Sequence, residues 1–171
     1  LFQGKSDLGN DSPFAPVYAQ TDTSVAQRAQ DLAKAKQLLA DAGHANGFST
    51  QLVGVDTGEV KDYAQLVADS AKQIGVNISL KIEGGDVYYG NTFGSSDWLD
   101  SIMSLCDYGH RGVPNVFLTA PLQTYNEKKG TGVWNAAHFA NAQYDKLVAD
   151  YIAAVDLQGQ KQLAGQIENL L

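Results

Sequence analysis

Residues 60–83 read "VKDYAQLVADSAKQIGVNISLKIE" and join two different periodicities at a single glycine. Before Gly75, apolar residues recur at helical spacing, at Val60, Tyr63, Ala64, Val67, Ala71 and Ile74. After Gly75 the chain alternates, with one apolar face formed by Val76, Ile78, Leu80 and Ile82. The stretch predicts a helix that ends at a glycine, followed by a strand with one buried face.

The same helix–glycine–strand pattern precedes this stretch. Residues 31–42 have helical spacing, with Asp31 as a capping residue and Gly43 as the stop, and residues 48–56 are predicted to form a strand. Together the two segments predict an α/β fold in which a small mixed sheet is flanked by helices.

The rest of the chain is predicted to add one more strand and several helices. We expect a strand over residues 97–105, a helix that begins with Pro114 as its first residue, and helices over 142–155 and from about 158 onward. Residues 1–22 carry two of the four prolines, so we expect an irregular leader close to a hinge, with residues 23–171 as a single lobe.

Charge and cysteine content exclude several classes of function. The net charge is −7, and the 12 basic residues are scattered, which argues against a nucleic-acid partner. Cys106 is the only cysteine, so an intrachain disulfide is impossible. No apolar run approaches the roughly 20 residues that cross a bilayer.

Residues 106–117, "CDYGHRGVPNVF", gather a thiol, an acid, an imidazole and a guanidinium. The Asp107 carboxylate and the Arg111 guanidinium suit a ligand that carries a cationic nitrogen and an acidic group. Alternatively, the two side chains pair with each other and brace the loop. Cys106 with His110 leaves open a cysteine-dependent hydrolase, but the spacing does not specify a nucleophile with its base. We predict no metal site and no cofactor.

Aromatic residues outside this segment add candidates for a ligand cleft. Trp134 lies in the loop "GTGVWN", where it either lines a cleft or packs against its own lobe. Tyr88, Tyr89 and Phe93 form a second candidate rim, and Trp98 is predicted to lie in the core.

Four segments resemble, in order, the solute-binding proteins of the peptide/nickel class (family 5), the receptors of ABC importers. The first is "DLAKAKQLLADAG" at 31–43, a signature of that class. The others are "GFSTQLV" at 47–53, "LVADSAKQIGVNISLKI" at 66–82 and "NAQYDKLVADYIAAVD" at 141–156. The resemblance implies the C-terminal lobe of a two-lobed periplasmic-binding-protein architecture (class II, cluster C), as a fragment of a longer protein.

The resemblance also implies a function and partners. It implies non-catalytic capture of a peptide or charged conjugate, delivery to an ABC permease of the inner membrane, and an N-terminal lobe of the same protein. The location would be the periplasm, or a lipid anchor on a Gram-positive cell. An isolated lobe is expected to bind weakly and to self-associate through the face left uncovered.

Asp107 and Tyr108 match an Asp-Tyr pair of the family, whose acid receives the ammonium group of the ligand in peptide receptors. His110 and Arg111 depart from the family pattern. We therefore predict a ligand site formed by Asp107, Tyr108, His110, Arg111 and Trp134. The sequence does not name the solute.

Overall fold

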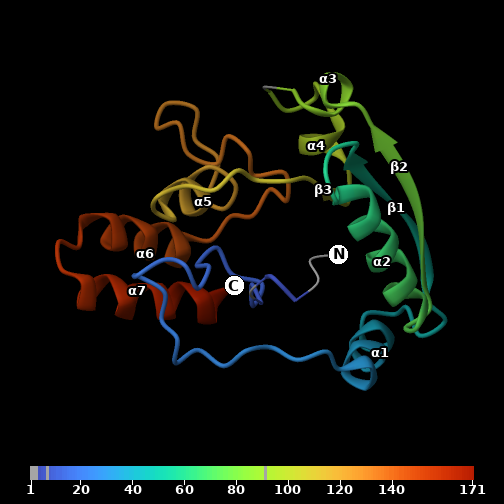
Figure 1. Cartoon of the computed structure of the whole chain (residues 1–171), viewed down its shortest axis with the longest axis horizontal. Helices are drawn as coiled ribbons and strands as arrows, with labels where there is room; N and C mark the ends of the chain where they lie inside the picture. The colour runs from blue at the N-terminus through green and yellow to red at the C-terminus, as the bar shows by residue number, and fades with distance from the viewer. Residues whose placement is uncertain (1–3, 7, 91) are drawn as a thin grey trace. The chain divides into compact units, whose positions relative to one another are not determined.

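The computed structural model describes residues 4–6, 8–90 and 92–171 (Figure 1). The chain forms two compact units. The first unit is Ala29–Tyr108, and the second combines Gly109–Leu171 with the described residues before Ala29. The boundary predicted at residue 22, between a leader and a single lobe, stays a prediction.

The first unit is built on a three-stranded sheet with the order β2-β1-β3. Its strands are β1 (Phe48–Val55), β2 (Val76–Glu83) and β3 (Ser104–Leu105). Both pairings are parallel, and β1 faces β2 from Phe48↔Val76 to Val55↔Glu83. The predicted α/β class is confirmed, although the sheet is parallel throughout the described residues rather than mixed.

The described residues of the first unit form four helices: α1 (Leu32–Asp41), α2 (Val60–Lys72), α3 (Gly85–Tyr88) and α4 (Asp97–Asp100). Asp31 caps α1 as expected, because its carboxylate accepts a hydrogen bond from the Lys34 amide at 2.8 Å. The helix α2 makes the crossover between β1 and β2, and lies alongside them in Figure 1.

The prediction of a strand over residues 97–105 was wrong for its first half, which forms α4. The Asp100 carboxylate accepts hydrogen bonds from the amides of Gly94 and Ser96, at 2.7 and 3.1 Å. These bonds favour a compact turn followed by a helix over an extended chain. Only Ser104–Leu105 pairs with β1.

The core of the first unit lies near the carboxyl end of β1. Val53 and Val55 pack there with Val60 of α2 and Tyr88 of α3. Trp98, Leu105 and Cys106 are partly buried against this cluster, which agrees with the prediction that Trp98 contributes to the core.

The second unit is helical: α5 (Asn115–Thr119), α6 (Ala142–Ala153) and α7 (Leu157–Leu170). Helix α5 begins directly after Pro114, within one residue of the predicted start. Asn141 caps α6 and Asp156 caps α7 through their side-chain oxygens. Helices α6 and α7 lie side by side (Figure 1), and their facing side chains enclose a core of Phe14, Leu118, Tyr144, Leu147, Val148, Tyr151, Ala164 and Ile167.

Within the part of the chain that the structure describes, no helix combines the length and the apolar character needed to cross a membrane.

Candidate functional site

The first part of the predicted site lies just beyond the carboxyl end of β3. Asp107 and Tyr108 follow Leu105 of that strand by two and three positions, and both side chains are exposed. Ligands of open parallel α/β sheets bind at the carboxyl ends of the strands. The location of this acid therefore fits a ligand-binding role.

Tyr89 holds the Asp107 carboxylate. The Tyr89 hydroxyl donates a hydrogen bond to Asp107 Oδ1 at 3.2 Å. Burial, together with the neighbouring Cys106 and Asp107, raises the pKa of Tyr89 to about 12. The phenol is therefore protonated at neutral pH and remains a donor to the acid.

Tyr89 packs against two further rings, and we call the three rings, Tyr88, Tyr89 and Trp98, the aromatic wall. Tyr89 makes edge contacts with both neighbours, at ring-centroid distances of 5.0 Å to Tyr88 and 5.5 Å to Trp98. The Trp98 indole donates to the Gly90 carbonyl at 2.7 Å, which fixes the orientation of its ring. Tyr88 is completely buried, so Tyr89, which is exposed, is the ring of this wall that a cationic nitrogen at Asp107 would meet.

An ion-pair network at the end of β2 anchors the helix that carries Trp98. Lys81 Nζ lies 2.8 Å from Glu83 Oε1 and 2.7 Å from Asp97 Oδ2. Hydrogen bonds to Asp97 and then to Glu83 raise the pKa of Lys81, so the amine keeps its charge. Since Asp97 is the first residue of α4, this network ties α4 to the sheet.

Cys106 lacks the character of a nucleophile. Its side chain is half-buried against the core, and burial, followed by the charge of Asp107, raises the pKa of the thiol to about 11. A reactive cysteine needs the opposite, a lowered pKa in an electropositive and accessible setting. Among the described residues, no group of three or more His, Cys, Asp or Glu side chains could hold a metal ion.

We expect Cys106 to react with iodoacetamide roughly 100-fold more slowly in the folded chain than in urea at pH 8. The raised pKa, about 11 against 9.0, leaves about one hundredth as much thiolate below pH 9. The folded-state rate should also keep rising as the pH approaches 11 instead of levelling near 9. A folded-state rate equal to the rate in urea would contradict this assignment.

The remaining predicted site residues belong to the second unit. His110 stacks on Tyr18, with ring centroids 5.9 Å apart and planes inclined by 12°. Arg111 Nη1 donates to the carbonyl oxygens of Gly109 at 2.8 Å and of His110 at 3.2 Å, so this side chain contacts its own loop. Trp134 is half-buried, and its amide donates to the Ala120 carbonyl at 2.9 Å. The ligand-binding roles of all five residues stay predictions.

The role of Tyr89 as the partner of Asp107 was not predicted from the sequence. The sequence predicts Tyr89 only as one member of a candidate rim, whereas in the structure it is the hydrogen-bond donor to Asp107. The interleaved aromatics of "GGDVYYGNTF" were the available signal, and their irregular spacing hid the partner.

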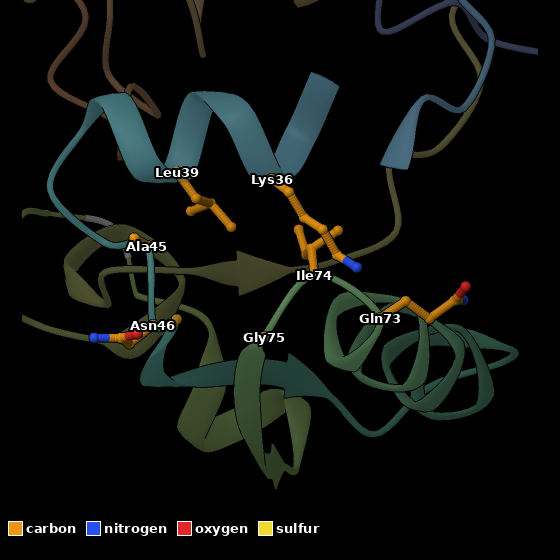
Figure 2. A pocket seen from close by; sticks show the side chains of 8 residues that line it. Lys36, Leu39, Ala45, Asn46, Gln73, Ile74 and Gly75 are labelled. Atoms are coloured by element: carbon orange, nitrogen blue, oxygen red, sulfur yellow. The ribbon is translucent and has the colours of Figure 1, made fainter. Parts of the chain in front are cut away.

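A hollow of about 310 Å³ lies at the opposite, amino-terminal edge of the sheet. Figure 2 shows Lys36 and Leu39 pointing from α1 toward the turn of Ile74 and Gly75, which leads into β2. Because the hollow lies away from the carboxyl ends of the strands, we assign it no ligand role.

Comparison with known proteins identifies the family. Residues 1–104 match the family described as bacterial extracellular solute-binding proteins, family 5 Middle. The chain belongs to this family. Family 5 solute-binding proteins are extracytoplasmic receptors and not enzymes, which confirms the prediction of a non-catalytic protein and excludes the hydrolase alternative. A comparison with curated protein sequences gives no match.

Solved structures agree on the fold of this family 5 chain. The oligopeptide-binding protein AppA from Bacillus subtilis, in complex with a nonapeptide, has a TM-score of 0.77 at 20% identity over 98% of this chain and 34% of its own. The periplasmic binding protein DppA from Helicobacter pylori, in complex with the peptide STSA, has a TM-score of 0.75 at 20% identity over 93% of this chain and 30% of its own. NikZ from Campylobacter jejuni, in complex with Ni(L-His), has a TM-score of 0.64 at 16% identity over 84% of this chain and 30% of its own. The chain thus spans about a third of the length of these proteins.

Proposed function

We propose that this chain is part of a receptor that captures a solute with a cationic nitrogen and passes it to an ABC permease without covalent change. The observation that carries the proposal is the exposed Asp107 carboxylate at the carboxyl edge of the sheet, held by Tyr89 beside the aromatic wall. A carboxylate fixed in this way is ready to accept charge-assisted hydrogen bonds from an ammonium group.

A short peptide or a similar charged conjugate is the solute that these groups favour. A peptide presents an ammonium group at one end and a carboxylate at the other near neutral pH. In this proposal Asp107 receives the ammonium group, Arg111 receives the carboxylate, and Tyr108, His110 and Trp134 contact the body of the ligand. The peptide complexes of AppA and DppA support this choice. The Ni(L-His) complex of NikZ makes a metal chelate the alternative solute.

The mechanism of such a receptor is closure on the ligand. A second lobe of the same protein would cover the bound solute, and the closed state would be favoured because only there does the ligand contact both lobes. The length of the solved relatives, about three times that of this chain, supports the existence of further lobes. The receptor would lie in the periplasm or on a lipid anchor at the cell surface.

Asp107→Asn is expected to weaken the binding of a free tripeptide by roughly 10- to 150-fold. This range corresponds to about 1.5–3 kcal/mol, the usual contribution of a hydrogen bond to a charged group. The measurement is an NMR titration of this chain, because binding to one lobe will be weak. N-acetylation of the tripeptide should produce the same loss in the unchanged chain and little further loss in Asp107→Asn.

Two comparisons make this test specific. Asp86→Asn removes another exposed carboxylate of the first unit and should leave binding unchanged. Arg111→Ala should lower the affinity for the free tripeptide by a similar factor but not the affinity for its C-terminal amide. If Asp107→Asn binds the tripeptide as tightly as the unchanged chain does, Asp107 is not the ammonium site.

A further inference from the structure

Glu168, near the end of α7, is a buried carboxylate that the proposed receptor site does not use. The residue is only 5% exposed. Its Oε1 accepts a hydrogen bond from the Ser12 hydroxyl at 2.8 Å, whereas its buried Oε2 has no hydrogen-bond partner among the described residues. A buried acceptor without a hydrogen-bond partner destabilises the folded state. Such an oxygen therefore usually interacts with a bound water molecule or an ion.

A second carboxylate lies on the same face of α7. A Cβ atom built on Gly165 would lie 2.3 Å from Asp22 Oδ2, so Asp22 rests directly on the helix backbone at Gly165. Gly165 and Glu168 are three positions apart and therefore share one helix face. Burial is the largest cause that raises the pKa of Glu168, and the charge of Asp22 raises it further, while the hydrogen bond from Ser12 and a smaller contribution from the Asp22 backbone amide lower it.

The two carboxylates line one cavity of about 350 Å³. Its other walls come from the N-terminal segment of the second unit, including polar residues such as Asn10, Thr21 and Ser24. A water molecule in the liquid takes up about 30 Å³, so the cavity has room for an ion with part of its hydration shell.

The Arg28 side chain does not take the place of such an ion at the Glu168 carboxylate. Arg28 Nη2 donates to the backbone oxygen of Glu168 at 3.5 Å rather than to its carboxylate. The same guanidinium lies 3.8 Å from Asp11. Lys161 acts on Asp22, whose pKa is lowered mainly by hydrogen bonds from Ser24 and to a small extent by this lysine.

We propose that Glu168 and Asp22 hold a partly hydrated divalent cation, Mg²⁺ or Ca²⁺, in this cavity. Both ions prefer hard oxygen ligands, and Mg²⁺ in particular binds through one or two carboxylates while it keeps several waters. Ser12 fixes the orientation of the Glu168 carboxylate through Oε1, which leaves Oε2 for the ion. The ion would tie the N-terminal segment to α7 and so act on the stability of the second unit.

The test is thermal unfolding of this chain at pH 7 in MgCl₂ or CaCl₂, against KCl at equal ionic strength. We expect a saturable rise in Tm of about 3–5 °C at ten times the dissociation constant. Glu168→Gln should abolish the rise, and Asp22→Asn should reduce it. Asp150→Asn, which removes a carboxylate paired with Lys146 on α6, should retain the full rise.

Other outcomes would overturn the proposal. One is a Tm that responds to the divalent salts no more than to KCl, and another is an equal rise in Glu168→Gln. A third is a Glu168→Gln chain more stable than the unchanged chain at pH 7, with no divalent effect in either, because Oε2 would then carry a proton. Circular dichroism checks the folding of Glu168→Gln, and if that variant fails to fold, Asp22→Asn with calorimetric titration of MgCl₂ decides.

Discussion

Gly47→Ala is expected to lower the free energy of unfolding of the first unit by about 4 kcal/mol. Gly47 has a φ of +74°, and a Cβ atom there would lie 1.9 Å from the carbonyl oxygen of Gly75. That oxygen belongs to the backbone, so it cannot rotate away as a flexible side chain can. Gly47 and Gly75 come directly before Phe48 and Val76, the first pair of the β1–β2 ladder, so relief of the clash would disturb the start of the sheet.

Gly43→Ala is the matched control for this prediction. Gly43 has a similar φ of +85°, but a Cβ atom there meets nothing within 4 Å. It should therefore cost only the left-handed conformation, about 1 kcal/mol. Urea unfolding followed by circular dichroism measures both variants, and amide exchange in β1 assigns the loss to the first unit. If both variants lose the same free energy of unfolding, the close contact between Gly47 and Gly75 is not the cause of the destabilisation.

The two helix–strand pairs of the first unit could be predicted because local residues determine them. A capping acid at Asp31, glycines at the helix ends and clean alternation in β2 all act over a few positions. Residues 97–100 could not be predicted in the same way. Asp97 bonds to Lys81, which is 16 positions away, and Asp100 accepts a hydrogen bond from an amide of the preceding loop. No local sequence pattern predicts these partners.

In the candidate site, too, the residues marked by a local sequence pattern could be predicted, and their distant partners could not. The Asp-Tyr pair at 107 and 108 could be found in the sequence, because it follows a strand and matches a family pattern. Its hydrogen-bond donor Tyr89 is 18 positions away and lies in a segment without a regular period. Ser12 and Glu168 are 156 positions apart, so only the folded chain brings the buried carboxylate to its partner.

Asn135→Asp is expected to destabilise the second unit by about 4 kcal/mol at pH 7. The Asn135 side chain is almost completely buried, at 1% exposure. Its amide nitrogen donates to the carbonyl oxygens of Gln123 at 3.0 Å and Phe139 at 2.7 Å, and its oxygen accepts from the Phe139 amide at 3.0 Å. An aspartate keeps the shape but directs a charged acceptor at two carbonyl oxygens.

Asn135→Ala separates the lost hydrogen bonds from the added charge. It should cost about 3 kcal/mol, because it leaves three backbone groups without their partner but introduces no repulsion. Asn126→Ala, in the same loop but exposed and with one side-chain bond to the Lys129 amide, should cost less than about 1 kcal/mol.

Urea unfolding gives the three values, and hydrogen exchange at the Phe139 amide should accelerate in both Asn135 variants. Because the backbone of Trp134 is held in this loop, its fluorescence should change with Asn135 and not with Asn126. A Phe139 amide as protected in Asn135→Ala as in the unchanged chain would mean that Asn135 does not hold the loop.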